Sequence, residues 1–257
     1  MPAETVLITG ASSGIGMELA RVFAAEGSNL VLAARREKRI AALAEQFRDE
    51  FVIDTVAIPA DLSEPDTPQI LLEKTQALGI EIDVLVNNAG FGQAGRFDRI
   101  DVNRHLDMIA VNIAALTHLT RLFLPGMVRR DRGGVLNVAS TAAFVPGPLV
   151  AVYYASKAYV LSFTEALAEE LAETSVTVSC LCPGPTKTEF AEIAGLDTST
   201  LFRLGMADAR KVAEAGVRGF RNRQVVILPG IRNKLTPPAI RVSPRSMVRK
   251  IVKKLQG

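Results

Sequence analysis

Tryptophan is missing from this 257-residue chain, and cysteine occurs only as Cys180 and Cys182. Two cysteines this close together on an extended segment project to the same face without forming an ordinary disulfide, so we interpret them as reduced, small apolar side chains. No uninterrupted apolar run reaches the roughly 18 residues of a membrane span. Met1 to Glu4 lack the basic and apolar regions of a secretory signal. These absences predict a cytoplasmic protein, and the two cysteines lack the further ligands that a metal site needs.

Acidic side chains are missing from residues 215–257, which hold 11 basic residues, whereas residues 1–214 hold 19 basic and 27 acidic residues. The net charge is therefore −8 on the body and +11 on the tail. An asymmetry of this kind indicates an anionic partner, a membrane surface, or a tail that docks on its own acidic body.

Apolar, β-branched segments alternate with helical patterns along the chain. Seven strands are expected at Thr5–Ile8, Asn29–Ala33, Val52–Ile58, Val84–Val86, Gly134–Val138, Val176–Leu181 and Gln224–Leu228. Helices are expected at Gly14–Glu26, Glu37–Phe51, Pro65–Leu78, Asp101–Arg130, Ala151–Thr174 and Ala207–Phe220. Continuous apolar strands joined by helices predict an α/β fold of the Rossmann type, a doubly wound, mainly parallel sheet with helices on both faces. We expect one domain over residues 1–231 and a basic extension over residues 232–257.

Three glycines follow the first strand at the point where the next helix begins: Gly10, Gly14 and Gly16. Glycine allows the backbone to turn sharply and a pyrophosphate to approach, and the helix N-terminus offers free N–H groups to anionic oxygen. A tight turn would explain the glycines equally well. Their position directly after the first strand favours a dinucleotide site.

Arg35 and Arg36 follow the second strand, where a sheet of this type meets the adenosine ribose. An acidic residue there would bind the ribose 2′-hydroxyl of NAD, whereas an arginine pairs with a 2′-phosphate. We therefore expect NADP(H) to be preferred over NAD(H), although Arg36 could equally be a solvated helix start. Asp61 and Leu62 follow the third strand and are expected to border the adenine.

Tyr153 and Lys157 share one face of an expected helix, thirteen residues after Ser140 ends the fifth strand, while Tyr154 is expected to point elsewhere. A phenol needs a nearby cation to exchange a proton near neutral pH, and Lys157 is spaced to supply it. Ser140 is placed to hold a substrate oxygen beside Tyr153. Asn112 is a poor helix former in an apolar helix, and its buried amide needs partners, which water and backbone near Lys157 could supply.

Taken in order, these motifs resemble the signature of the short-chain dehydrogenase/reductase family, in its NADP(H)-preferring carbonyl reductase or ketoreductase subgroup. The resemblance covers residues 5 to about 190 and implies that Tyr153 is the general acid/base. It further implies that Lys157 binds the nicotinamide ribose and lowers the pKa of Tyr153, that Ser140 holds substrate and that Asn112 supports a water relay. The glycine turn, the positions after the strands and the resemblance together predict the residues that bind the cofactor. These are Gly10, Ser12, Ser13, Gly14, Ile15, Gly16, Arg35, Arg36, Asp61, Leu62, Asn88, Ala89, Gly90, Tyr153, Lys157, Pro183, Gly184, Thr186 and Thr188.

The tail departs from the family's commonest form. An amphipathic helix is expected from Arg245 to Leu255, with five apolar residues on one arc and lysines and arginines opposite. It could pack on its own body or on a second subunit, attach peripherally to a membrane surface, or contact an anionic acyl carrier or coenzyme thioester. The basic segment carries no nucleic-acid recognition motif. Residues Glu189 to Arg203 are expected to form a mobile lid over the substrate.

The sequence thus predicts an NADP(H)-dependent oxidoreductase that interconverts a small-molecule carbonyl and an alcohol by hydride transfer. One rival is a non-catalytic dinucleotide-sensing or scaffold protein recruited through its basic tail. Another is an epimerase or dehydratase that uses the same tyrosine and lysine. The resemblance also implies a homodimer or homotetramer.

Overall fold

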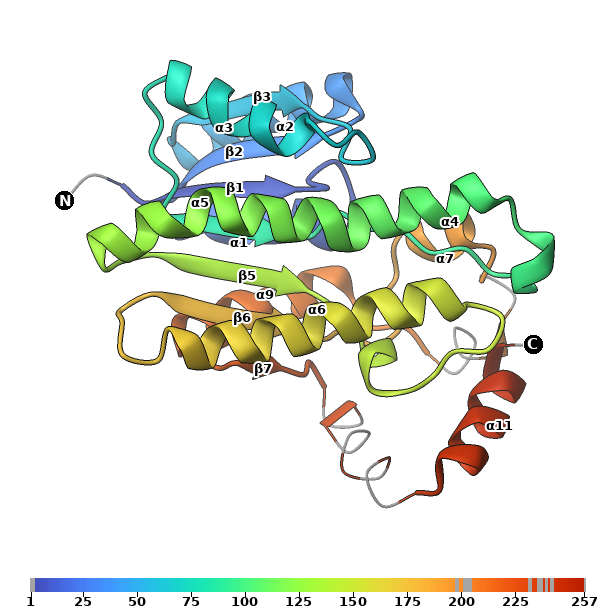
Figure 1. The fold of residues 1–257 in the computed structure, drawn as a ribbon. Coiled ribbons are helices and arrows are strands. Elements are labelled where there is room, and N and C mark those ends of the chain that lie inside the picture. Colours follow the sequence, from blue (N-terminus) through green and yellow to red (C-terminus); the bar gives the residue numbers. More distant parts are fainter. Residues whose placement is uncertain are drawn as a thin grey trace.

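A seven-stranded parallel sheet forms the middle layer of the computed structural model, which describes residues 3–196, 199–200, 205–230, 233–234, 238, 240 and 243–256 (Figure 1). The strands are β1 (Thr5–Thr9), β2 (Asn29–Ala34), β3 (Thr55–Pro59), β4 (Val84–Asn87), β5 (Gly134–Val138), β6 (Thr177–Leu181) and β7 (Val226–Ile227). Their order is β3-β2-β1-β4-β5-β6-β7. The direction of winding therefore reverses between β1 and β4, and a ligand site is expected beyond the strand ends at this point. The predicted Rossmann-type fold is confirmed.

Helices cover both faces of the sheet (Figure 1). They are α1 (Gly14–Ala25), α2 (Glu37–Phe51), α3 (Thr67–Ala77), α4 (Val102–Ile109), α5 (Leu116–Arg130), α6 (Ala151–Glu170), α7 (Phe190–Ala194), α9 (Ala209–Arg221) and α11 (Arg245–Gln256). Val84, Leu85 and Val86 of β4 are fully buried. The strands are apolar along their length because each side of the sheet faces a helix layer rather than water.

Two separate apolar layers hold the helices to the sheet. On one face Phe23 of α1, Phe47 of α2 and Phe220 of α9 pack in a single cluster with the strands. On the other face the cluster includes Leu71 of α3 and Leu119 of α5. Burying a side chain of this size stabilises the fold by about 1.5–3 kcal/mol. The carboxyl ends of the strands are therefore held between two packed layers of helices.

A continuous helix runs from Val102 to Arg130, because a π-helical segment, Ala110–Ala115, joins α4 to α5. By length and apolar composition alone this helix could cross a membrane. Its inner face, however, packs against the sheet through the buried Phe123 and Met127.

Several element boundaries differ from the prediction. Val52 does not begin a strand: it ends α2 in the left-handed region, at φ 55°, and β3 starts at Thr55. Helix α6 stops at Glu170, and β7 spans only two residues. Such ends are set by backbone geometry, which hydrophobic pattern does not reveal. Of the expected lid, Phe190–Ala194 forms α7, whereas residues 197–198 and 201–203 lie outside the described part, so the lid stays a prediction.

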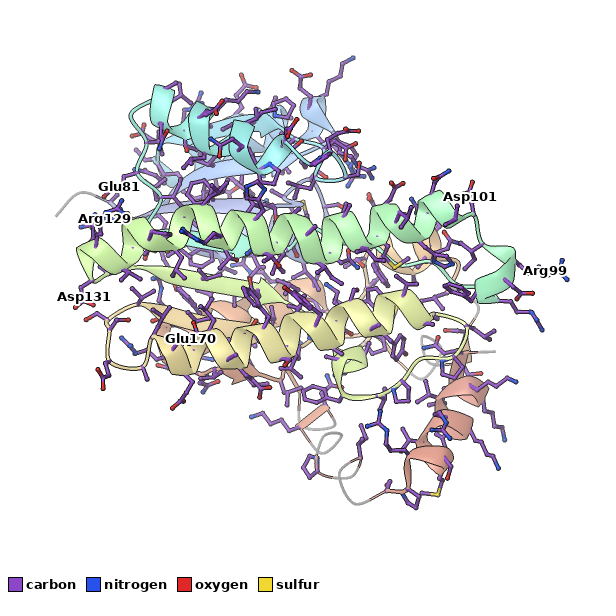
Figure 2. All side chains as sticks on the ribbon, in the orientation of Figure 1. Glu81, Arg99, Asp101, Arg129, Asp131 and Glu170 are labelled. Carbon is purple, nitrogen blue, oxygen red and sulfur yellow. The ribbon has the colours of Figure 1, made fainter. Side chains whose placement is uncertain are left out.

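Helix α11 packs on the body of its own chain. Val248 and Val252 are buried in an apolar cluster with residues of α6 and α7, but Met247 and Ile251 are about half exposed. The expected apolar stripe is thus only partly covered by the body. Its lysines and arginines form no ion pair within the described part of the chain, and Figure 2 shows nitrogen-tipped side chains projecting from the outer side of this helix. Earlier in the basic tail, residues 215–257, Arg221 pairs with Glu4 and Glu26.

Candidate functional site

The glycine turn between β1 and α1 is fixed to the end of β4. Asn88 Nδ2 donates to the carbonyl oxygens of Thr9 (2.9 Å) and Gly10 (3.2 Å), and Thr9 Oγ1 accepts from the backbone N–H of Asn88. Gly10 has a φ of +65°, and a Cβ on Gly16 would lie 2.4 Å from the Gly10 carbonyl oxygen. Only glycine fits such a backbone. The turn leaves the N-terminus of α1 facing the cleft, where free N–H groups suit a pyrophosphate.

Arg36 is held by neighbouring residues. Its guanidinium donates to Ser12 Oγ (3.0 Å) and Ser13 Oγ (2.5 Å) and pairs with Glu189 (2.7 Å). Arg39 pairs with the same carboxylate at 2.8 Å. Hydrogen bonds from Arg36 and Arg39 lower the pKa of Glu189 to about 2. Arg36 thus lies at the start of α2 with a side chain that is still 42% exposed, and its expected role as a 2′-phosphate ligand stays a prediction. The contact with Glu189 could not be foreseen, because the two residues lie 153 positions apart.

Arg35 is exposed beside Asp61. Burial would raise the pKa of Asp61, but hydrogen bonds from Ser63 and the charge of Arg35 outweigh it and hold this pKa below its usual value. Leu62 is buried in the core cluster under β3. Arg35 is thus an exposed cation directly after β2, where a phosphate could reach it.

The structure brings Ser140, Tyr153 and Lys157 together. Ser140 caps a short 3₁₀ turn, Thr141–Phe144, by accepting from the Ala142 N–H, and it forms a side-chain hydrogen bond with Tyr153. Lys157 Nζ lies 5.8 Å from the centre of the Tyr153 ring and donates to the Val138 carbonyl at 2.8 Å. A phenol, a hydroxyl and an ammonium therefore converge where β5 ends.

Burial dominates the acid–base properties of this group. It raises the pKa of Tyr153 well above the usual value, and the hydrogen bond with Ser140 offsets only part of the rise. It lowers the pKa of Lys157 to about 8. The pKa of Tyr153 rises in the structure because burial outweighs the hydrogen bond with Ser140, and the lowering of this pKa by Lys157 that the resemblance implies stays a prediction. Tyr153 is thus a protonated acid near neutral pH.

Asn112 lies in the π-helical segment, an irregularity that is frequent at functional sites. Its Oδ1 accepts from the Phe91 N–H (3.1 Å), and its Nδ2 donates to the Phe91 carbonyl and to Ser156 Oγ, both at 3.0 Å. The Phe91 backbone directly follows Gly90, which lies close to Lys157, so a backbone partner near Lys157 is present as expected, and Ser156 adds a side-chain partner. A Cβ on Gly90 would lie 3.0 Å from Asn112 Oδ1 and 3.4 Å from Lys157 Nζ, so the glycine keeps the two polar groups close. A water relay between them stays a prediction.

A cleft of about 220 Å³ opens beyond the ends of the central strands. Most expected site residues line it: Gly10, Ser13, Gly14, Ile15, Gly16, Asn88, Ala89, Gly90, Ser140, Tyr153, Lys157, Pro183, Gly184, Thr186 and Thr188. Ser12 lines an adjoining groove with Arg39 and Glu189. The glycine cradle and the open end of α1 fit a dinucleotide, and Lys157 and Thr188 lie where its nicotinamide half would extend along the cleft.

Part of the cleft was not predicted. Tyr154 lines it, which corrects the expectation that this side chain points elsewhere. The first turn of α6 enters the cleft, and Tyr154 packs so closely on Gly147 that a Cβ there would overlap the ring. Phe190 and Ile193 of α7, Leu196 and Gln256 complete the wall. Phe190, Ile193 and Leu196 belong to the segment that was expected to cover the substrate, whereas Gln256 follows the amphipathic pattern of residues 245–255 and was not predicted to reach the cleft.

Comparison with known proteins gives a consistent result. The family model of short chain dehydrogenases matches residues 4–197. The chain is 31% identical over 232 residues to the ketoacyl reductase HetN of Nostoc sp., covering 89% of this chain and 79% of that protein.

Two solved structures share the whole fold. A short-chain dehydrogenase from Sphingobium yanoikuyae in complex with NADPH is 34% identical, with a TM-score of 0.83 over 93% of this chain and 94% of the other. A short chain dehydrogenase/reductase from Burkholderia phymatum in complex with NAD is 25% identical, with a TM-score of 0.83 over 99% and 97%. Similar proteins thus bind either dinucleotide.

Proposed function

Because this chain belongs to the short chain dehydrogenase family, we propose that it is an oxidoreductase that reduces a ketone or aldehyde to an alcohol with NADP(H), in a reversible reaction. The observation that carries the proposal is the convergence of Ser140, Tyr153 and Lys157 at the closed end of the cleft, next to a cradle that fits a dinucleotide.

The residues of the chain supply proton transfer and orientation. Ser140 and Tyr153 donate hydrogen bonds to the substrate oxygen and hold the carbonyl in place. As charge develops on this oxygen, Tyr153 transfers its proton to it, and the Lys157 ammonium stabilises the phenolate that remains. The nicotinamide, when bound, supplies the hydride in reduction and accepts it in oxidation. A raised pKa of Tyr153 keeps the phenol protonated, which is the state that reduction needs.

The cofactor preference is inferred from charge. Arg35 is the exposed cation at the end of β2, and no acidic residue follows that strand directly to bind a ribose 2′-hydroxyl. Arg36 already donates hydrogen bonds to Ser12 and Ser13 and pairs with Glu189, so we assign the 2′-phosphate to Arg35 rather than to Arg36. An arginine that pairs with a 2′-phosphate favours NADP(H) over NAD(H).

The deciding experiment follows NADPH and NADH oxidation at 340 nm across a panel of apolar ketones and aldehydes. We expect turnover with NADPH to exceed that with NADH, and Arg35→Asp to lower kcat/KM for NADPH about 10- to 100-fold while improving NADH. Lys74→Asp, a charge reversal at an exposed position of α3 away from the cleft, is the matched control. Equal use of both cofactors by the unaltered protein would refute the preference, and no oxidation of either would support the non-catalytic rival. An epimerase or dehydratase would convert substrate with no net consumption of cofactor.

A further inference from the structure

Gln256, the last described residue of α11, carries an unexpected polar group into an apolar part of the cleft. The inward positions of this helix are otherwise valines, Val248 and Val252, which pack with Tyr154 and with Leu196. Gln256 lines the same cleft and is only 7% exposed. A buried primary amide is costly unless it is hydrogen-bonded, so a glutamine at this place needs partners.

Only one of its two polar atoms has a partner within the described part of the chain. Gln256 Nε2 donates to the hydroxyl oxygen of Tyr154. Gln256 Oε1 is buried and accepts no hydrogen bond there. Because Gln256 lines the cleft, this oxygen can accept from a donor that enters the cleft while Nε2 keeps its bond to Tyr154.

Tyr154 completes a pair of complementary groups. Because its oxygen already accepts from Gln256, its phenolic hydrogen remains available to donate. Burial also raises the pKa of Tyr154, so this hydroxyl stays neutral and keeps its hydrogen. The site therefore offers one acceptor, Gln256 Oε1, and one donor, Tyr154 Oη.

A neutral hydroxyl is the group that satisfies both at once, since it donates one hydrogen bond and accepts another. A second ketone oxygen or a carboxylate cannot donate. Among the described residues, the charged ones that line the cleft are Lys157, at the reaction centre, and Glu189, which is held by Arg36 and Arg39. The described residues of the cluster that contains Val248, Val252 and Tyr154 are apolar or uncharged, so they offer an ionic group no partner.

The geometry relates this site to the reaction centre. The rings of Tyr153 and Tyr154 are adjacent, with centroids 6.0 Å apart and planes at 76°. A substrate whose carbonyl contacts Tyr153 therefore reaches Tyr154 and Gln256 across a short apolar spacer lined by Phe190 and Leu196.

We propose that Tyr154 and Gln256 form a hydroxyl-binding subsite, and that the substrate is an apolar hydroxy ketone or hydroxy aldehyde, or the corresponding diol in the reverse direction. This inference rests on the proposed carbonyl reductase function. The remote hydroxyl undergoes no reaction, and its role is to orient the carbonyl that does.

The test uses matched substrates: a series of 4-(hydroxyalkyl)cyclohexanones and the 4-alkylcyclohexanones of equal length, each with NADPH. We expect the protein to prefer the best hydroxyalkyl ketone over its alkyl match by about 10- to 100-fold in kcat/KM, because an apolar group would leave buried polar atoms unpaired. Gln256→Leu, of similar size, should remove this preference by lowering kcat/KM for the hydroxyalkyl ketone alone. Tyr154→Phe keeps the ring in its cluster and should reduce the preference in the same way.

Two controls separate the outcomes. Lys253→Gln changes an exposed position of α11 and should leave the preference intact, and NADPH affinity reports whether each variant is folded. Equal kcat/KM for the two series, or a preference unchanged in both Gln256→Leu and Tyr154→Phe, would overturn the subsite while leaving carbonyl reduction in place. Failure to reduce any member of either series would instead overturn the proposed function, and the subsite with it.

Discussion

Helices α6 and α11 both reach the cleft, but they are anchored in different ways. Helix α6 lies on the sheet, with Val160 and Thr164 fully buried and Thr164 accepting from Asn137 of β5 at 3.0 Å. Helix α11 packs through Val248 and Val252, and within the described part of the chain it reaches into the cleft by the hydrogen bond from Gln256 to Tyr154. A proton donor must be held in one position for catalysis, whereas a wall that selects substrates needs only a complementary surface.

The comparison predicts that substitutions of Tyr153 and Lys157 on α6 act on the chemical step, whereas substitutions on α11, and of Tyr154 where α11 contacts α6, act on what the protein binds. Three experiments below test this division in order of expected effect, and the Gln256 variants provide a further one.

The largest effect is expected for Tyr153→Phe. Loss of the general acid should lower kcat by about 10³-fold, because proton transfer by a positioned side chain contributes on the order of 10²–10⁴. NADPH affinity, measured by fluorescence titration, should change little. Tyr159→Phe, on the exposed side of the same helix, should keep nearly full activity. A Tyr153→Phe protein with wild-type kcat would refute the assigned acid.

Raising the pH is expected to have an intermediate effect on kcat/KM for reduction. Since the pKa of Lys157 is lowered to about 8, kcat/KM for reduction should fall about tenfold per unit above this pH as the ammonium loses its proton. Stability should change in the opposite sense. Between about pH 8 and pH 10.4 the unfolded chain binds the lysine proton and the folded chain does not, so the Lys157 contribution to stability rises with pH.

Rate and melting temperature measured over the same pH range distinguish these trends. A constant kcat/KM up to pH 10 would show that Lys157 need not be charged. A fall in kcat/KM that coincides with a fall in melting temperature would assign the loss to unfolding instead.

The smallest effect is expected on the outer face of α11. Peripheral membrane contact stays a prediction, supported by the cations of this helix, which pair with no described acidic residue, and by the exposed Met247 and Ile251. Lys250→Gln should weaken cosedimentation with vesicles that contain anionic phosphatidylserine by about fivefold, the effect of about 1 kcal/mol per cation. Lys74→Gln on α3 is the control. Turnover of a water-soluble ketone should be unchanged, and a loss of turnover would break the division between the two helices.

Cytoplasmic location and a homo-oligomeric state also stay predictions, since neither depends on a contact within one chain. The exposed Val102 and Leu106 of α4 are available for a partner surface, but their exposure does not identify the partner.

The sequence by itself determined the sheet, the glycine turn and the pairing of Tyr153 with Lys157. Strand period, helix period and the needs of a glycine backbone are local, so a few neighbouring residues suffice to fix them. Ser140 joined them because it follows a strand, and the ends of parallel strands meet at one edge.

Only the tertiary structure decided which side chains enclose the cleft and how its acids and bases are tuned. Gln256 meets Tyr154 across 102 positions, and Glu189 pairs with Arg36 across 153. The direction of the pKa shift of Tyr153 likewise depends on burial. Long-range contacts and desolvation are properties of the packed molecule, and no spacing along the chain records them.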